Sequence, residues 1–152
     1  MVGPNAERTG TVRHAARMFV TGASLQVPFF TIVLRKGYGL GAQAMGGGSF
    51  REGLFTVAWP TGEFGAMGLE GSVRLGFRKE LEAISDPAER QALFDRMVAQ
   101  AYEHGKGLNV ASHLELDDVI DPVDSRRWIV GGLRLAARQA DDAPRRRTVD
   151  TW

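Results

Sequence analysis

Residues 35–45 read RKGYGLGAQAM and directly follow the apolar run PFFTIVL of residues 28–34. This order predicts a buried strand, a tight glycine turn and the first turn of a helix. Gly37, Gly39 and Gly41 lack Cβ atoms and therefore allow close approach to the backbone. The first N–H groups of a helix have no acceptor within it, so such a turn can hold an anion or an oxyanion. A tight turn without a ligand fits the same pattern, because glycine spacing alone is a weak signal.

The composition is that of one globular domain without a strong charge bias. The chain has 152 residues, is 43% hydrophobic and 24% charged, and carries a net charge of +1. This balance gives no electrostatic footprint for nucleic acid, so we expect no nucleic-acid partner. The absence of cysteine excludes disulfides and thiolate-bound zinc and fits a cytoplasmic location. No apolar run approaches the roughly 20 residues of a membrane span, so we expect no membrane segment.

Periodic patterns on both sides of the glycine turn predict alternating helices and strands. Apolar residues at spacings of three and four predict helices over residues 6–25, 69–84, 86–104 and 121–140. Apolar runs predict strands over residues 28–34, 54–59 and 114–120, and a short strand within residues 64–67. Because the first of these runs does not alternate, we expect both of its faces to be covered. The alternation indicates an α/β domain over residues 1–140, followed by a polar, flexible tail at residues 141–152.

Few side chains are suited to acid–base or metal chemistry. The three histidines, at positions 14, 104 and 113, form no HxxxH or HExxH pair, so we expect no metal site. Glu63 and Glu70 flank glycine-rich segments and are candidate acid–base groups, although solvated carboxylates are the simpler interpretation. No serine lies in a G-x-S-x-G motif, which argues against a hydrolytic triad. The residues alone therefore support one activity, the stabilisation of an oxyanion by backbone amides.

Four blocks of sequence resemble the motifs of one enzyme family, in the family's order. Residues 7–16, ERTGTVRHAA, are similar to E-x-x-G-x-x-R-H-G-A, and residues 35–45 are similar to R-K-x-Y-G-G-A-x-x-x-M. Residues 58–73, AWPTGEFGAMGLEGSV, are similar to A-W-P-x-A-E-x-x-V-M-G-x-x-G-A-V, and residues 117–126, DDVIDPVDSR, to D-D-V-I-x-P-x-x-T-R. On these blocks the chain resembles the carboxyltransferase (beta) subunits of biotin-dependent acyl-CoA carboxylases over residues 7 to about 135.

The resemblance implies a crotonase-like α/β fold, in which strand–strand–helix (ββα) units stack as a spiral. It also implies a reaction, the transfer of a carboxyl group from carboxybiotin to the α-carbon of an acyl-CoA. The carboxybiotin belongs to a separate carrier protein, and no metal is involved. In this family two oxyanion holes made of backbone amides carry the catalysis, one for the thioester enolate and one for the biotin ureido oxygen. No side-chain base is required.

The resemblance places the biotin-side oxyanion hole on the backbone N–H groups of Leu40 and Gly41. Leu40 departs from the Gly-Ala pair that many members have here, but a backbone donor survives a change of side chain. The positions implied to line the biotin and substrate site are Gly37, Tyr38, Gly39 and Gln43. Within the family, the position of Gln43 is associated with the choice of acyl chain.

The resemblance also implies that the chain is the C-terminal portion of a longer subunit. A full family subunit is several times longer and has two crotonase-type domains. We therefore expect a domain truncated at its N-terminus, without the acyl-CoA-side oxyanion hole. Whether the chain is an enzyme by itself stays open, because activity would need an N-terminal half. The implied partners are a biotin carboxylase and biotin carrier (alpha) subunit, that N-terminal half, and other beta subunits in a homo-oligomer.

Two other functions stay open on the sequence. The chain fits an inactive truncated remnant or an assembly partner of full-length beta subunits. It also fits a crotonase-like hydratase or thioesterase, which would need an acid–base pair such as Glu63 and Glu70 beside the glycine turn.

Overall fold

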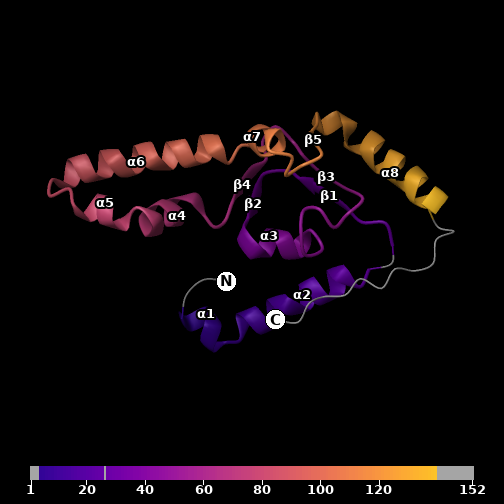
Figure 1. Cartoon of the computed structure of the whole chain (residues 1–152), viewed down its shortest axis with the longest axis horizontal. Helices are drawn as coiled ribbons and strands as arrows, with labels where there is room; N and C mark the ends of the chain where they lie inside the picture. The colour runs from indigo at the N-terminus through magenta and orange to yellow at the C-terminus, as the bar shows by residue number, and fades with distance from the viewer. Residues whose placement is uncertain (1–3, 26, 140–152) are drawn as a thin grey trace.

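The structure is a computed structural model that describes residues 4–25 and 27–139. The tail predicted at residues 141–152 lies outside these residues. Small parallel sheets at the centre carry helices around them, and two helical extensions project to either side (Figure 1). The α/β class is therefore confirmed. Among the described helices, none combines the length and apolar character that crossing a membrane requires.

Within the described residues, five short strands form two separate parallel sheets. They are β1 (Phe30–Val33), β2 (Lys36–Tyr38), β3 (Phe55–Ala58), β4 (Glu63–Gly65) and β5 (Asp118–Val119). The first sheet has the order β1-β3-β5, and the second pairs β2 with β4. The strands predicted near residues 28–34, 54–59 and 64–67 are thus confirmed in type and position. The strand predicted over residues 114–120 is reduced to two residues, because the chain turns and bends over residues 113–117, where Leu114 has a φ of 60°.

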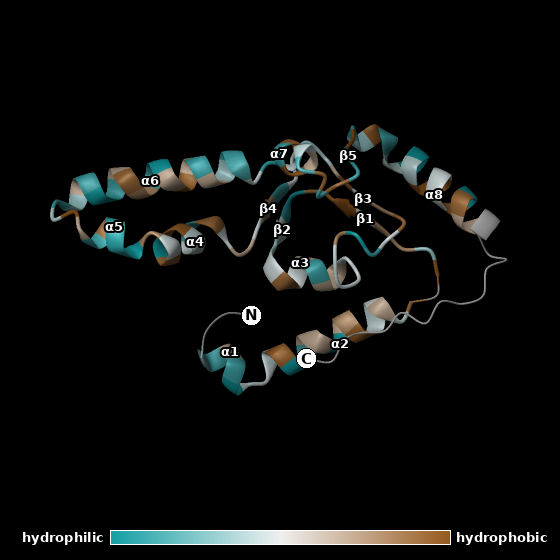
Figure 2. Ribbon diagram, in the orientation of Figure 1, coloured by the Kyte–Doolittle hydropathy of each residue, from teal (hydrophilic) through white to brown (hydrophobic). Residues whose placement is uncertain are grey.

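Strand β3 is the centre of the core, and all four of its residues are buried. On one side Phe55, Val57 and Ile120 form a cluster to which Phe30 and Trp128 add their rings. The Phe30 and Phe55 rings stack at 4.8 Å between centroids, and the Trp128 ring meets Phe55 edge-on at 5.2 Å. Figure 2 shows the apolar residues gathered on β1 and β3. Burial of these rings holds the C-terminal helix against the sheet.

The expectation that both faces of the first strand are covered is confirmed in part, since Val33 packs in one core cluster and Phe30 and Ile32 pack against the other. In β1 only Val33 is buried, and the other three residues are half-buried. The reason is the strand order, since β1 lies at an edge of its sheet and β3 takes the central place.

Helices occupy the predicted stretches, with breaks that the periodicity does not indicate. They are α1 (Pro4–Arg8), α2 (Thr11–Ala23), α3 (Gly39–Met45), α4 (Leu69–Gly76), α5 (Arg78–Glu82), α6 (Pro87–His104), α7 (Gly107–Ser112), the 3-10 turn η1 (Pro122–Asp124) and α8 (Ser125–Gln139). The single helix predicted over residues 6–25 is wrong, because Gly10 adopts a φ of +70° and separates α1 from α2. The helix predicted over residues 69–84 breaks at Phe77, whose φ of −111° is not helical. Helix α7 was not predicted.

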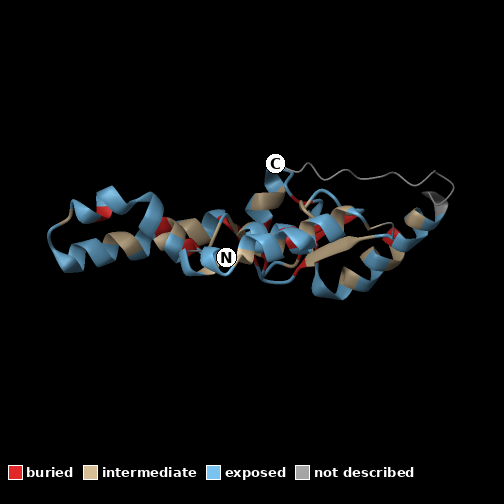
Figure 3. Ribbon diagram, turned by 90° about the horizontal axis from the view of Figure 1, so that it is seen from below, coloured by how far each residue is buried: buried red, intermediate tan, exposed pale blue. Residues whose placement is uncertain are grey.

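The helices α4, α5 and α6 form an arm that extends away from the sheets (Figure 1). Helix α6 begins as predicted, with the Asp86 carboxylate accepting hydrogen bonds from the N–H groups of Ala88 and Glu89. Its predicted apolar stripe is half-buried, and Arg74 of α4 lies 5.0 Å from the ring centroid of Phe94. Figure 3 shows buried residues gathered around the strands, with the arm and α2 largely exposed.

Two neighbouring glycines of α8 test how tightly this helix packs on the sheet. A Cβ on Gly132 would lie 2.5 Å from Cε1 of Phe30 and 2.9 Å from Cε1 of Phe55, whereas a Cβ on Gly131 meets no described atom within 4 Å. We expect Gly132→Ala to lower the free energy of unfolding by about 1–3 kcal/mol through overpacking. Gly131→Ala is the matched control and is expected to raise it by about 0.5–1 kcal/mol through helix propensity. Urea unfolding of both variants checks this, and equal stability of the two would contradict the packing of α8.

Candidate functional site

The glycine turn is the junction between strand β2 and helix α3, with no loop between them. Strand β2 pairs with β4 in the register Lys36↔Glu63, Gly37↔Phe64 and Tyr38↔Gly65. Tyr38 is extended, with φ −108° and ψ 133°, and α3 begins at the next residue. The strand therefore delivers the chain directly to the amino end of the helix.

The two first glycines of the turn have steric roles. Gly37 is buried in β2, where a Cβ would lie 3.3 Å from Cγ1 of Val33 and 3.4 Å from Cε1 of Phe64. Gly39 adopts a φ of +62°, and a Cβ there would lie 2.7 Å from the carbonyl oxygen of Ala66. Both the backbone conformation and the lack of space require glycine at position 39.

The amino end of α3 is open. Leu40 is 59% exposed, and Gly41 and Gln43 are also exposed. A Cβ on Gly41 would meet nothing within 4 Å in the described part of the chain. The N–H groups of Leu40 and Gly41 lie in the first helical turn and have no acceptor within the helix. These donors lie at the positive end of the helix, and the two residues that carry them are exposed.

Two tyrosine–glutamate pairs lie beside the junction. The Tyr38 hydroxyl donates a hydrogen bond of 2.8 Å to Oε2 of Glu63, and the Tyr102 hydroxyl donates one of 2.8 Å to Oε1 of Glu70. Burial, followed by the hydrogen bond to Glu63 and its charge, raises the pKa of Tyr38 well above its usual range. A hydrogen bond from its own backbone N–H and one from Tyr102 lower the pKa of Glu70. Glu70 is thus a carboxylate at neutral pH, and its pair lies on the arm.

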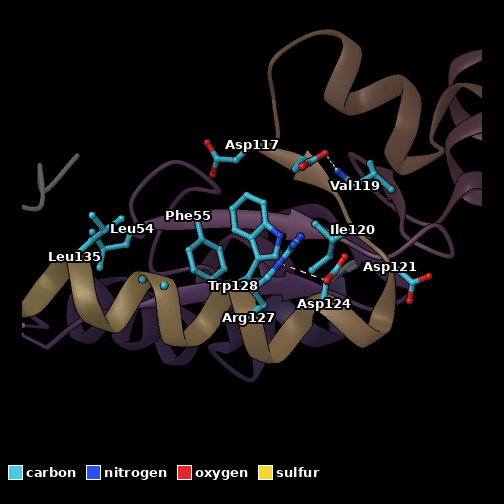
Figure 4. Close-up of a pocket in the computed structure, with 13 residues that line it drawn as sticks. Leu54, Phe55, Asp117, Val119, Ile120, Asp121, Asp124, Arg127, Trp128 and Leu135 are labelled. Carbon is cyan, nitrogen blue, oxygen red and sulfur yellow. Dashed lines mark hydrogen bonds and ion pairs between the residues drawn. The ribbon is translucent and has the colours of Figure 1, made fainter.

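A separate hollow of about 660 Å³ lies between β3, β5 and α8 (Figure 4). Its described lining holds apolar side chains such as Leu54, Phe55 and Trp128, and no residue of the glycine turn. Three of its four aspartates accept hydrogen bonds from backbone N–H groups, and the fourth, Asp124, forms an ion pair with Arg127 at 3.4 Å. The carboxylates of Asp117 and Asp121 accept hydrogen bonds from the N–H groups of Thr56 and Val123, at 2.7 and 2.9 Å. Such hydrogen bonds are typical of turn and cap residues. In the described residues no group of three or more histidines and carboxylates is arranged to hold a metal ion.

The comparisons with known proteins identify the family. A family model of the carboxyl transferase domain matches residues 1–149. The chain belongs to the carboxyl transferase domain family. It is 35% identical to the methylmalonyl-CoA carboxyltransferase 12S subunit of Propionibacterium freudenreichii subsp. shermanii, over 93% of this chain and 26% of that protein. It is 32% identical to the carboxyltransferase subunit of propionyl-CoA carboxylase from Haloferax mediterranei, over 93% of this chain and 27% of that protein.

Solved structures of the family share the fold. A single-chain, multi-domain long-chain acyl-CoA carboxylase is 64% identical, with a TM-score of 0.73, over 86% of this chain and 12% of that chain. The transcarboxylase 12S subunit, described as a hexamer assembly, is 31% identical, with a TM-score of 0.75, over 99% of this chain and 28% of that chain. The beta subunit of geranyl-CoA carboxylase from P. aeruginosa is 28% identical, with a TM-score of 0.77, over 95% of this chain and 28% of that chain. The fold is therefore the crotonase-like fold of carboxyltransferase subunits.

The chain spans about a quarter of the length of the curated relatives named above. The four sequence blocks that resemble the family lie next to one another in the folded chain. Strand β2 of the block at residues 35–45 pairs with β4 of the block at residues 58–73. Strand β5 of the block at residues 117–126 pairs with β3. The block at residues 7–16 lies in α1 and α2, and α2 packs against α3.

The local geometry of the glycine turn predicts opposite effects for Gly39 and Gly41. We expect Gly39→Ala to lower the free energy of unfolding by about 1–3 kcal/mol, because an L-residue is strained at positive φ and the methyl meets Ala66. Gly41→Ala is the control, since its methyl enters open space, and we expect it to be neutral or slightly stabilising. Thermal unfolding of both variants provides the measurement. A Gly39→Ala protein as stable as the parent would show that the turn has another conformation.

Proposed function

We propose that this chain forms the biotin-side part of an acyl-CoA carboxyltransferase, in which the N–H groups of Leu40 and Gly41 bind the ureido oxygen of carboxybiotin. One observation supports the proposal: Leu40 and Gly41 at the amino end of α3 are exposed, and a Cβ on Gly41 would meet no described atom within 4 Å. A planar ureido group needs such close approach to the backbone, and two adjacent N–H donors suit a single oxygen. The residues present therefore fit the group.

The chemistry follows from where negative charge develops. Carboxybiotin, when bound, supplies the carboxyl group, and its ureido oxygen gains negative charge as that group leaves. The N–H groups of Leu40 and Gly41 stabilise this charge, and each such donor contributes about 3–4 kcal/mol in related oxyanion holes. The donors are held in place before the reaction, because Gly39 and the β2–β4 pair set the start of α3. The leucine side chain at position 40 is exposed and leaves the donor free.

The substrate we propose is an acyl-CoA thioester, carboxylated at its α-carbon. The relatives named above act on methylmalonyl-, propionyl-, geranyl- and long-chain acyl-CoA by their descriptions, and another relative, from Mycobacterium leprae, is described as biotin-dependent. We assign the second oxyanion hole, for the thioester enolate, to the part of a family subunit that this chain does not span. The partners we propose are a biotin carboxylase and biotin carrier subunit, an N-terminal half, and other beta subunits.

The hydratase or thioesterase alternative gains no support from the geometry. Both of its candidate carboxylates are engaged with tyrosines, Glu63 with Tyr38 and Glu70 with Tyr102. The lowered pKa of Glu70 removes it as a general acid at neutral pH. The role of an assembly partner is separated from catalysis by the experiment below.

The test is reconstitution of carboxyl transfer. The chain is co-expressed with the N-terminal remainder of a family subunit, and transfer from methylmalonyl-CoA to free biotin is measured. A Cβ on a helical residue tilts toward the amino end of the helix, so Gly41→Val places its methyl groups where biotin would lie. We expect it to lower the rate at least about a hundredfold without loss of stability.

The control for this test is Leu40→Ala, which keeps the N–H donor and trims an exposed side chain. We expect its rate to stay within about threefold of the parent, since surface substitutions of this kind change little. Equal rates for Gly41→Val and the parent would contradict the assignment of the biotin side. Assembly of the two parts without transfer would instead favour the role of a non-catalytic assembly partner.

A further inference from the structure

Tyr38 is the residue that joins strand β2 to helix α3. It is the N-cap residue of α3, yet within the described residues its side chain makes no capping hydrogen bond to the helix. The ring instead extends across the second sheet toward β4. The side chain of Tyr38 thus contacts the sheet, while its backbone precedes the first residue of the helix.

The Tyr38 ring is fixed along its length. Its partner in the β2–β4 register is Gly65, and a Cβ there would lie 3.6 Å from Cδ1 of Tyr38. Residues two apart on a strand share a face, so Lys36 lies on the same side, with its Nζ 5.9 Å from the ring centroid. The hydroxyl donates to Oε2 of Glu63 at 2.8 Å. A half-buried ring with contacts at both ends has little freedom to turn.

Glu63 is itself held by the backbone around it. Its N–H donates to the carbonyl oxygen of Arg35 at 2.6 Å, and it forms an isolated antiparallel bridge with Lys106. The next N–H, that of Phe64, donates to the carbonyl oxygen of Gly105 at 2.7 Å. Glu63, the acceptor of the Tyr38 hydroxyl, therefore lies on a strand that is hydrogen-bonded on both sides, to the segment that leads into β2 and to the segment after α6.

The junction needs such an anchor because Gly39 supplies none. Glycine reaches a φ of +62° without steric penalty, but it also reaches many other conformations at similar free energy. The directions of the Leu40 and Gly41 N–H groups depend on the peptide units on both sides of Gly39. On the strand side, the anchored residue is Tyr38.

We propose that the hydrogen bond from Tyr38 to Glu63 positions the peptide units at the start of α3, so that the Leu40 and Gly41 N–H groups converge on one oxygen. The inference rests on the proposed function. Tyr38 acts through the backbone and does not touch the reacting atoms, so it is a positioning residue.

Burial and the hydrogen bond to Glu63 keep the Tyr38 hydroxyl in the donor form. Its pKa is raised first by burial and then by Glu63, with smaller contributions from Tyr102 and Glu70. The hydroxyl therefore stays protonated at any pH at which the carboxyltransferase would work, and the hydrogen bond is kept over that range.

The test compares Tyr38→Phe with Tyr102→Phe. The first removes the hydroxyl at the junction and keeps the ring. The second removes the Tyr102 hydroxyl of the arm, which bonds to Glu70 and also interacts with Tyr38, and it leaves the hydrogen bond from Tyr38 to Glu63 in place. In the chain alone, NMR order parameters of the Leu40 and Gly41 amides are expected to fall from about 0.85 to below about 0.6 in Tyr38→Phe, and to stay unchanged in Tyr102→Phe.

The kinetic arm uses the reconstituted enzyme described above. We expect Tyr38→Phe to lower kcat for carboxyl transfer about ten- to a hundredfold with KM for the acyl-CoA unchanged, because misplaced donors weaken only the transition state. We expect Glu63→Ala to lower kcat as much as Tyr38→Phe does. Glu63→Gln keeps a hydrogen-bond acceptor and is expected to recover part of kcat. The double variant Tyr38→Phe/Glu63→Ala is expected to have a kcat no lower than that of either single variant. A loss of stability alone would not produce this pattern.

The outcomes separate this inference from the proposed function. Unchanged order parameters or unchanged kcat for Tyr38→Phe in an active enzyme would overturn the positioning role alone. Absence of transfer in every reconstituted mixture would overturn the proposed function and this inference with it.

Discussion

Parallel pairing of β2 with β4 sets the position of helix α3, and the candidate site depends on that pairing. Each strand has only three residues, so few backbone hydrogen bonds hold the pair. The neighbours compensate, because the N–H groups of Glu63 and Phe64 bond to the backbone before β2 and after α6. Strand β4 therefore lies between the start of the glycine turn and the end of the helical arm. A shift of its register by one residue would turn Tyr38 away from Glu63.

The buried strand β3 supports this arrangement from the first sheet. Ala58 at its end belongs to the same core cluster as Val33 and Phe64, so the two sheets share apolar contacts. On its other side the aromatic rings of Phe30, Phe55 and Trp128 attach α8. Few large side chains are fully buried among the described residues, and many apolar ones on α2, α3 and α8 are exposed. The proposal that other parts of a carboxyltransferase subunit complete the site is consistent with these exposed surfaces.

Local signals predicted much of the fold. The Asp86-Pro87 pair correctly predicts the start of α6, and the apolar run of residues 54–59 correctly predicts β3. The break at Gly10 was missed because periodicity reports which residues face the core and carries no information on φ. Strand β2 was taken as part of a glycine turn, since its pairing partner β4 lies far along the chain and parallel register is a tertiary property.

The candidate site was likewise predicted from the sequence only in part. The glycine pattern predicts an accessible helix start, and the resemblance to the family places the donors on Leu40 and Gly41. The contact between Tyr38 and Glu63 was not predicted, because no spacing rule relates residues on two parallel strands joined by a long crossover. Glu63 belongs to the AWPTGE block that resembles the family, but only the strand register shows that it lies beside Tyr38.

The most direct measurement is a structure of this chain assembled with the rest of a carboxyltransferase subunit and with biotin bound. The ureido oxygen is predicted to lie about 2.7–3.1 Å from the backbone nitrogens of both Leu40 and Gly41, in front of α3. A ureido oxygen bound to other donors, or biotin seated in the hollow beside α8, would contradict the central claim.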